Sequence, residues 1–303
     1  MVRLVDLTKS FGKTTALDGV SLTMGPGEVF GYLGPNGAGK TTTIRLLMGM
    51  LRPTSGRAEI LGRDSWRRSA EAHKLVGYVP GETALYDRLT GGDHVAFCSH
   101  LRHQDDSKRA GELAGRLGLD LSLPAKALSR GNRQKLAVVL AMMSGPRLLV
   151  LDEPTSGIDP LVQQVFHALL REHTALGGAV LLSSHVLGEV ERVADRIGVV
   201  RQGRLVAVER LQDLAARSLH RVHASFAEDI AAADYEALPG VRDVIVTQRI
   251  LSCSAPESSL DALLKRVSER HVMDFECVEA PLEETFLSYY GSKDDVRGGS
   301  HAH

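Results

Sequence analysis

The chain has 303 residues, of which 43% are hydrophobic, enough for one large or two ordinary domains. Its formal net charge of −1 and pI near 6.9 give neither a basic surface typical of nucleic-acid binding nor an acidic, disordered tail. Cys98, Cys253 and Cys277 lie far apart and show no metal-ligand spacing or disulfide framework, which suits a reducing compartment.

The first residues, Met1–Asp6, lack the charged-then-apolar order of a signal peptide. No apolar run approaches the roughly 18 residues needed to span a bilayer. We therefore expect any membrane association to depend on a partner.

Two short strands are predicted at the start of the chain, Leu4–Leu7 and Ala16–Leu22, around a turn at Lys9–Lys13. Phe11 is an aromatic residue in this turn. It either stacks on a purine ring or is a partly buried turn residue, and the pattern alone favours neither role.

A glycine-rich loop follows a predicted strand, Glu28–Leu33, and precedes a predicted helix, Thr42–Met48. It fits G-x-x-x-x-G-K-[ST], in which main-chain N–H groups and the helix N-terminus surround a phosphate. Lys40 would reach the β- and γ-phosphates of a nucleotide, and the Thr41 hydroxyl would bind Mg²⁺. The predicted nucleotide-binding residues of this loop are Gly34, Pro35, Asn36, Gly37, Ala38, Gly39, Lys40, Thr41 and Thr42.

A helical insertion is predicted at about residues 88–145, with two helices between Thr90 and Leu119 that are broken near Asp105. A Ser129-x-Gly131 turn then precedes an apolar helix. Such a turn can hold an anion, although it is more often an ordinary helix cap.

Two carboxylates, Asp152 and Glu153, follow the predicted buried strand Leu148–Leu151, at the end where ligands bind in open α/β sheets. In a protein with a phosphate loop, an aspartate there holds Mg²⁺, and the adjacent glutamate can accept a proton from an attacking water. His185 follows another predicted strand, Ala179–Ser184. It could contact a γ-phosphate or the attacking water, and a structural role stays open.

Taken in chain order, these motifs resemble the ATP-binding subunit of an ABC transporter over about residues 2–215. The phosphate loop matches Walker A and Leu148–Glu153 matches Walker B. Ser156–Asp159 matches the D-loop, in which Asp159 is the site residue. Phe11 takes the adenine-stacking position and His185 that of the switch histidine. The resemblance implies a P-loop NTPase core of the ABC ATPase type.

The resemblance also implies that ATP and Mg²⁺ are bound and that ATP is hydrolysed. Glu153 would be the catalytic base, with Lys40 and His185 at the γ-phosphate. Thr41 and Asp152 would hold the metal ion.

Two motifs depart from the family pattern. The signature, at Leu128–Asn132, usually reads Leu-Ser-Gly-Gly-Gln, whereas Arg130 and Asn132 here replace the first Gly and the Gln. Ser129 and Gly131 are retained, so contact with a γ-phosphate on a second copy is still expected.

The glutamine expected in the Q-loop is Gly81 here, and Glu82 follows. A carboxylate cannot donate as an amide does, so whether Glu82 holds a metal-bound water or takes part only in coupling stays open. In both departures the sequence resembles the branch of the family that serves ABC-2-type exporters of drugs, antibiotics or lipids.

The family implies two copies that sandwich two ATP molecules, each Walker A facing the signature of the other copy. It implies a separate multi-span permease as the second partner, and no nucleic acid. The expected location is the cytoplasmic face of the cell membrane, peripheral through the permease. The expected function is ATP hydrolysis that powers export of a small molecule.

Two other functions are less well supported. A soluble ABC-type ATPase acting on nucleic acid or ribosomes usually has a coiled-coil insertion or two fused cassettes, and neither is present in this sequence. A P-loop kinase would need an acceptor pocket and a lid. It would also leave the Ser129 turn and His185 unexplained.

A strand pair, Ile197–Val200 and Arg204–Ala207, is expected to complete the ATP-binding domain, which we place at residues 1–215. Residues 216–290 then alternate as β-α-β-β-α-β, which predicts a small α+β domain of the ferredoxin-like type. Its role is either regulatory and dimer-stabilising or merely structural. A terminal helix is expected from Pro281 and a disordered tail over residues 291–303. The predicted elements of the small domain are Arg221–Phe226, Ile230–Leu238, Val241–Gln248, Ile250–Ser254, Ser258–Arg270 and Val272–Val278.

Overall fold

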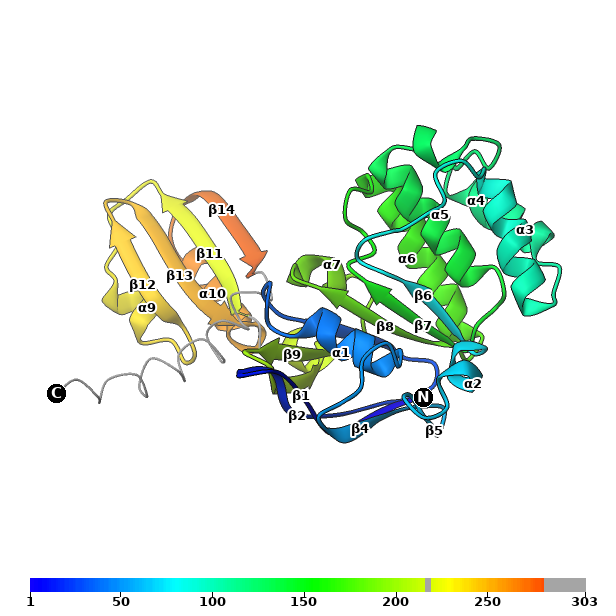
Figure 1. Ribbon diagram of the computed structural model, residues 1–303. Coiled ribbons are helices and arrows are strands. Elements are labelled where there is room, and N and C mark those ends of the chain that lie inside the picture. Colours follow the sequence, from blue (N-terminus) through cyan, green and yellow to red (C-terminus); the bar gives the residue numbers. More distant parts are fainter. Residues whose placement is uncertain (216–218, 281–303) are drawn as a thin grey trace. The chain divides into compact units, whose positions relative to one another are not determined.

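The computed structural model describes residues 1–215 and 219–280 (Figure 1). The chain divides into two compact units, Met1–Glu209 and a second that begins at Arg210. The sequence places this border after residue 215 instead. That residues 1–215 bind ATP and residues 216–290 form an accessory domain stays a prediction. The terminal helix expected from Pro281 and the tail at 291–303 lie outside the described residues.

The first unit is built on a six-stranded sheet in the order β10-β9-β3-β8-β7-β6. The pairings of β3 with β8 and β9, and of β7 with β6 and β8, are parallel, so their carboxyl ends meet at one edge. Strands β3, β7 and β8 are buried along their whole length, as expected for strands covered on both faces. The bounds are β3 Val29–Leu33, β6 Val76–Val79, β7 Leu148–Asp152, β8 Ala179–Ser184, β9 Arg196–Arg201 and β10 Arg204–Arg210.

A second, antiparallel sheet has the order β2-β1-β4-β5, with β1 Val2–Phe11, β2 Thr14–Met24, β4 Ser55–Ile60 and β5 Arg63–Asp64. The predicted turn at Lys9–Lys13 is wrong in extent, because pairing between the first two strands continues to Phe11 opposite Thr14. Only Gly12 and Lys13 form the turn.

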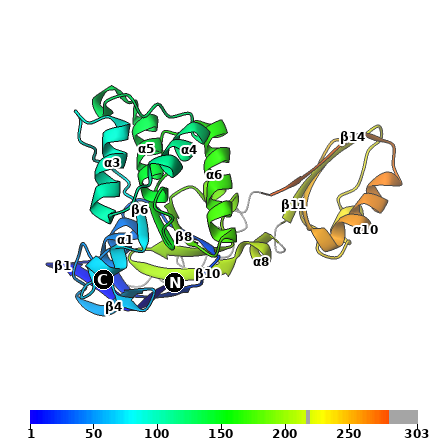
Figure 2. The same cartoon turned by 90° about the vertical axis from the view of Figure 1, so that its right-hand side faces the viewer.

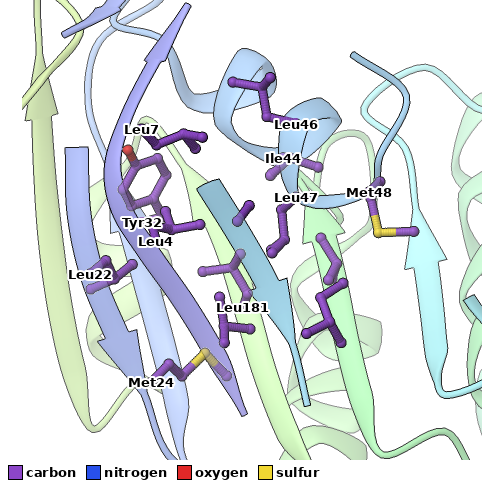
Figure 3. Packing of buried hydrophobic residues seen from close by; sticks show 14 of the residues in the cluster. Leu4, Leu7, Leu22, Met24, Tyr32, Ile44, Leu46, Leu47, Met48 and Leu181 are labelled. Atoms are coloured by element: carbon purple, nitrogen blue, oxygen red, sulfur yellow. The ribbon is translucent and has the colours of Figure 1, made fainter. Parts of the chain in front are cut away.

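Helix α1 (Lys40–Leu47) lies between these two sheets and contacts β2 and β4 on one side and β7 on the other (Figure 3). Ile44, Leu46 and Leu47 are buried in an apolar cluster of this unit, together with Leu4 and Leu181. Because this helix is packed on two sides, its N-terminus is held at the carboxyl edge of the parallel sheet.

The predicted pair of helices broken near Asp105 is confirmed as α3 (Gly91–Arg102) and α4 (Ser107–Arg116). Thr90 begins α3 through a capping box, in which Thr90 Oγ1 accepts from the Asp93 N–H and the Asp93 carboxylate accepts from the Thr90 N–H. Figure 2 shows α3, α4 and α5 (Arg130–Met142) grouped on the side of the parallel sheet opposite the antiparallel sheet. Helix α6 spans Pro160–Ala175. Four short helices are not predicted from the sequence: α2 Ser69–His73, η1 Ala125–Ala127, α7 Leu187–Glu191 and α8 Leu211–Ala215.

The second unit confirms the predicted β-α-β-β-α-β order, in a sheet ordered β12-β13-β11-β14. All of its pairings are antiparallel, and one strand separates the two strands that each helix connects, which is the split βαβ arrangement of ferredoxin-like domains. Val222, Leu251 and Leu263 form its core with Tyr235. The bounds are β11 Leu219–Phe226, α9 Ala233–Glu236, β12 Arg242–Thr247, β13 Ile250–Pro256, α10 Glu257–Ser268 and β14 Val272–Glu279.

Within residues 1–215 and 219–280, no helix combines the length and the apolar character needed to cross a bilayer.

Two buried histidines on α6 predict that this fold is sensitive to acid. His167 and His173 are 8% and 7% exposed, and the Nε2 atom of each has no hydrogen-bond partner among the described residues. Burial lowers the pKa of both imidazoles from the ordinary value of 6.5. Because the unfolded chain binds protons that the folded chain excludes, stability is lost as the pH falls below 6.5.

We predict that His173→Gln reduces this acid sensitivity. Each buried histidine contributes at most about 1.4 kcal/mol of lost unfolding free energy per pH unit below its unfolded pKa. Urea denaturation at about pH 7 and about pH 5.5 measures the difference, with the exposed His100→Gln as control. An equal acid loss in wild type and His173→Gln would contradict the prediction.

Candidate functional site

The phosphate loop leaves β3 at Gly34 and enters α1 at Lys40, as the sequence predicts. Gly39 has φ +109°, and a Cβ atom there would lie 2.6 Å from Leu17 Cδ2 and 2.8 Å from the Ala16 carbonyl oxygen. Only glycine therefore lets the loop pass so close to β2. Gly39 also precedes the first turn of α1, whose unpaired N–H groups can receive a phosphate oxygen.

Lys40 is only 5% exposed, and its charged amine is held by oxygen atoms. Its Nζ donates to the carbonyl oxygens of Gly34 at 2.7 Å and Pro35 at 3.3 Å. It also lies 3.5 Å from Glu153 Oε1. The amine is thus positioned across the phosphate loop, where a nucleotide phosphate would replace its carbonyl partners.

The same oxygen of Glu153, Oε1, lies 3.1 Å from His185 Nδ1. The structure therefore brings together the three predicted catalytic residues, Lys40, Glu153 and His185, from three separate segments. Glu153 has φ +49°, a left-handed conformation uncommon for a non-glycine residue. Such a conformation persists only where neighbours impose it, and the Glu153 N–H is held 3.2 Å from both the carbonyl oxygen and Oγ of Ser183.

Asp152 is 2% exposed, and its Oδ1 accepts from Ser183 Oγ at 2.5 Å. The pKa of the nearby Tyr78 hydroxyl is raised by burial and then by the negative charge of Asp152. A Cβ atom at Gly81 would lie 3.5 Å from Asp152 Oδ2, so the Q-loop backbone passes beside this carboxylate. The Glu82 side chain is exposed.

These donors fit Mg²⁺. Asp152 supplies a carboxylate and the exposed Thr41 a hydroxyl, both hard oxygen ligands. Among the described residues, no group of three or more His, Cys, Asp and Glu side chains could hold a metal ion alone. This is the donor set of a metal ion that arrives with the phosphates of its nucleotide, since Mg²⁺ is usually bound by one or two carboxylates together with phosphate oxygens.

The signature residues lie at the start of α5, where Ser129 caps the helix by accepting from the Asn132 N–H at 3.3 Å. They contact the D-loop of the same chain. Arg130 Nη2 donates to Ser156 Oγ at 2.8 Å, and Gly131 packs against Gly157. Among the described residues, no hydrogen bond joins the signature to the phosphate loop.

Two further predicted site residues are Asp159 of the D-loop and Phe11 at the end of β1. Asp159 caps α6 by accepting from the Val162 N–H at 3.0 Å. Phe11 is 50% exposed, with Lys9 Nζ 4.9 Å from the centre of its ring. An exposed ring with a cation on one face keeps its other face free for a purine, so adenine stacking by Phe11 stays a prediction.

Sequence reasoning missed Ser183 and Glu189. Ser183 holds both Asp152 and the backbone of Glu153, and its signal is a hydroxyl residue near the carboxyl end of a buried strand that begins with four apolar residues. Glu189 Oε2 accepts from Thr155 Oγ1 and from Ser184 Oγ, each at 2.9 Å. Its carboxylate therefore connects the segment after Glu153 to the segment before His185.

Comparison with known proteins agrees with this geometry. A family model described as "ABC transporter" matches residues 17–156. The linearmycin resistance ATP-binding protein LnrL of Bacillus subtilis (strain 168) is 32% identical over 306 residues, which cover 96% of this chain and 98% of that protein. The bacitracin transport ATP-binding protein BcrA of Bacillus licheniformis is 31% identical over 68% of each chain. A solved structure titled "Structure of ATP binding subunit of ABC transporter" has a TM-score of 0.66 at 28% identity, and covers 71% of this chain and 91% of that one.

The fold and site define a P-loop ATPase in which Lys40 and His185 meet at the carboxylate of Glu153. The chain belongs to the family of ABC transporter ATP-binding proteins, and the resemblance seen in its motifs is confirmed.

We predict that Ser183→Ala slows ATP hydrolysis. The change removes the donor to Asp152, a charge-assisted hydrogen bond whose loss of about 1.5–3 kcal/mol corresponds to at least about a tenfold fall in kcat if the carboxylate shifts. Steady-state hydrolysis measured across Mg²⁺ concentrations tests this. Ser99→Ala, which removes a buried hydroxyl from α3, is the matched control. Equal kcat in the two variants would show that Ser183 does not position Asp152.

Proposed function

We propose that two copies of this chain bind and hydrolyse ATP to power export of a small molecule, a drug, antibiotic or lipid, through a separate ABC-2-type permease. The observation that carries the ATPase part is the contact of Glu153 Oε1 with both Lys40 and His185. The export part is supported by the names of relatives, which include linearmycin resistance and bacitracin transport proteins. The chain would work at the cytoplasmic face of the membrane.

The geometry supports the following roles for the residues of the site. The Lys40 amine would leave the carbonyl oxygens of Gly34 and Pro35 for the β- and γ-phosphates, which carry more negative charge. Glu153 would then orient the attacking water and accept its proton, while His185 holds the carboxylate and contacts the γ-phosphate. Mg²⁺, held by Thr41 and Asp152, would neutralise charge on the β- and γ-phosphates.

The second copy supplies the signature. Ser129 caps α5 with an extended backbone, so the helix N-terminus and its N–H groups are exposed to an anion. In the proposed dimer these groups face the γ-phosphate bound by the other copy. ATP then holds the two copies together, and hydrolysis releases them.

An apolar group on the helical subdomain supports a permease partner. Tyr86, Phe97 and Leu101 are 62%, 44% and 63% exposed. The rings of Tyr86 and Phe97 meet edge to face at 6.0 Å. Exposed aromatic residues grouped in this way are typical of protein contact surfaces, and Tyr86 lies shortly after the Q-loop in sequence.

We predict that Glu153→Gln binds ATP and forms a stable dimer but turns over at least about a hundredfold more slowly, because the amide cannot accept the proton. Size-exclusion chromatography with ATP and Mg²⁺ measures the dimer, and phosphate release measures turnover. Glu59→Gln, a change in the antiparallel sheet, is the control. Unchanged turnover in Glu153→Gln would count heavily against the mechanism.

The partner is tested by co-purification of the full chain with the membrane protein encoded next to its gene. Recovery of a multi-span membrane chain, together with ATPase stimulation by its cargo, is the expected result. Recovery of ribosomes or nucleic acid would favour a soluble ABC-type ATPase. A phosphorylated small molecule as product would favour a kinase.

A further inference from the structure

Arg130 is the first residue of α5 and lies along the D-loop turn of its own chain. Its Nη2 donates to Ser156 Oγ at 2.8 Å. Its Cδ and Cγ atoms lie 3.6 and 3.7 Å from the position of a Cβ atom at Gly157. The aliphatic part of the side chain thus packs over Gly157, while the guanidinium group holds Ser156.

A second contact joins the same two segments. A Cβ atom at Gly131 would lie 2.6 Å from the Gly157 carbonyl oxygen, so the two backbones are in close contact. Gly157 itself has φ +80°, which fixes the direction of the turn. Two successive residues of the signature therefore contact two successive residues of the D-loop. A glycine in place of Arg130 would retain only the backbone contact.

The charge of Arg130 has no carboxylate partner among the ion pairs of the described residues. Arg133, one turn further along α5, differs: its Nη2 lies 3.1 Å from Asp87 Oδ1. Arg130 instead contacts a neutral hydroxyl, and its side chain is exposed. It is thus a link between two loops rather than half of an ion pair.

We propose that Arg130 joins the signature and the D-loop of one copy into a single rigid surface against which the second copy docks when ATP is bound. This inference rests on the homodimer of the proposed function, and it takes the D-loop, which contacts the signature, to face the second copy together with it. Arg130 is a positioning residue for Ser129 and Asp159. Joining the two loops in advance reduces the entropy that is lost when both are ordered on association.

The test uses the full chain in the Glu153→Gln background, in which hydrolysis does not dissolve the dimer. Arg130→Ala, Arg130→Lys, Ser156→Ala and the Arg130→Ala/Ser156→Ala double variant are compared, with Arg133→Ala as the matched arginine control. Light scattering gives the ATP concentration for half-maximal dimer formation. A fluorescent ATP analogue at low protein concentration gives the affinity of the single copy, and thermal unfolding reports the fold.

We expect Arg130→Ala and Ser156→Ala each to raise the ATP concentration for half-maximal dimer formation about threefold to tenfold, as for loss of one charge-assisted hydrogen bond that is partly exposed. The double variant should be no worse than either single variant, because both remove one contact. Arg130→Lys should restore part of the effect. The affinity of the single copy, the melting temperature and the Arg133→Ala result should not change.

Several outcomes would overturn the inference. If Arg130→Ala has no effect, or if Ser156→Ala has none while Arg130→Ala weakens the dimer, the link to the D-loop is not what matters. If the double variant raises the ATP concentration by the product of the two single effects, Arg130 and Ser156 act independently, which also contradicts the proposed link. If the chain with Arg130 intact forms no ATP-dependent dimer at all, the homodimer itself is overturned, and this role falls with it.

Discussion

One carboxylate oxygen, Glu153 Oε1, connects the separate parts of the site. It contacts Lys40 at the end of the phosphate loop and His185, which directly follows β8, while Glu153 itself directly follows β7. The three segments meet because β3, β7 and β8 are parallel neighbours whose carboxyl ends share one edge. In the proposed mechanism the carboxylate of Glu153 is already oriented by these contacts when a nucleotide binds, and only Lys40 exchanges its carbonyl partners for phosphate oxygens.

The supporting contacts are short and buried, whereas the contacts available to a second copy are exposed. Ser183 fixes Asp152 and the left-handed backbone of Glu153 from inside the sheet. The signature and D-loop meet each other at the surface through Arg130 and Ser156. The chain therefore holds the predicted site residues from inside the sheet and joins two surface loops to each other, an arrangement that suits the proposed ATP-dependent dimer.

The second unit is a complete small domain with its own apolar core. Its split βαβ topology could be predicted because turn residues separate short segments that alternate between a period of two and a period near 3.6. Helix α9 covers only Ala233–Glu236, whereas the predicted element is Ile230–Leu238. Ile230 and Leu238 still pack on the apolar core with Tyr235, although they lie outside the helix. The similarity to LnrL extends over this unit and not only over the first, because it covers 96% of the chain.

The sequence alone determined the phosphate loop, the paired carboxylates and the order of the longer elements, because each follows from local residue patterns: glycine backbone freedom, a buried strand with an acidic end, and periodicity. Only the tertiary structure decided that Glu153 touches both Lys40 and His185, that Ser183 holds Asp152, and that Arg130 holds Ser156. Those contacts join residues from different elements, and their formation depends on strand order, register and side-chain packing, none of which is encoded in the spacing of a single motif.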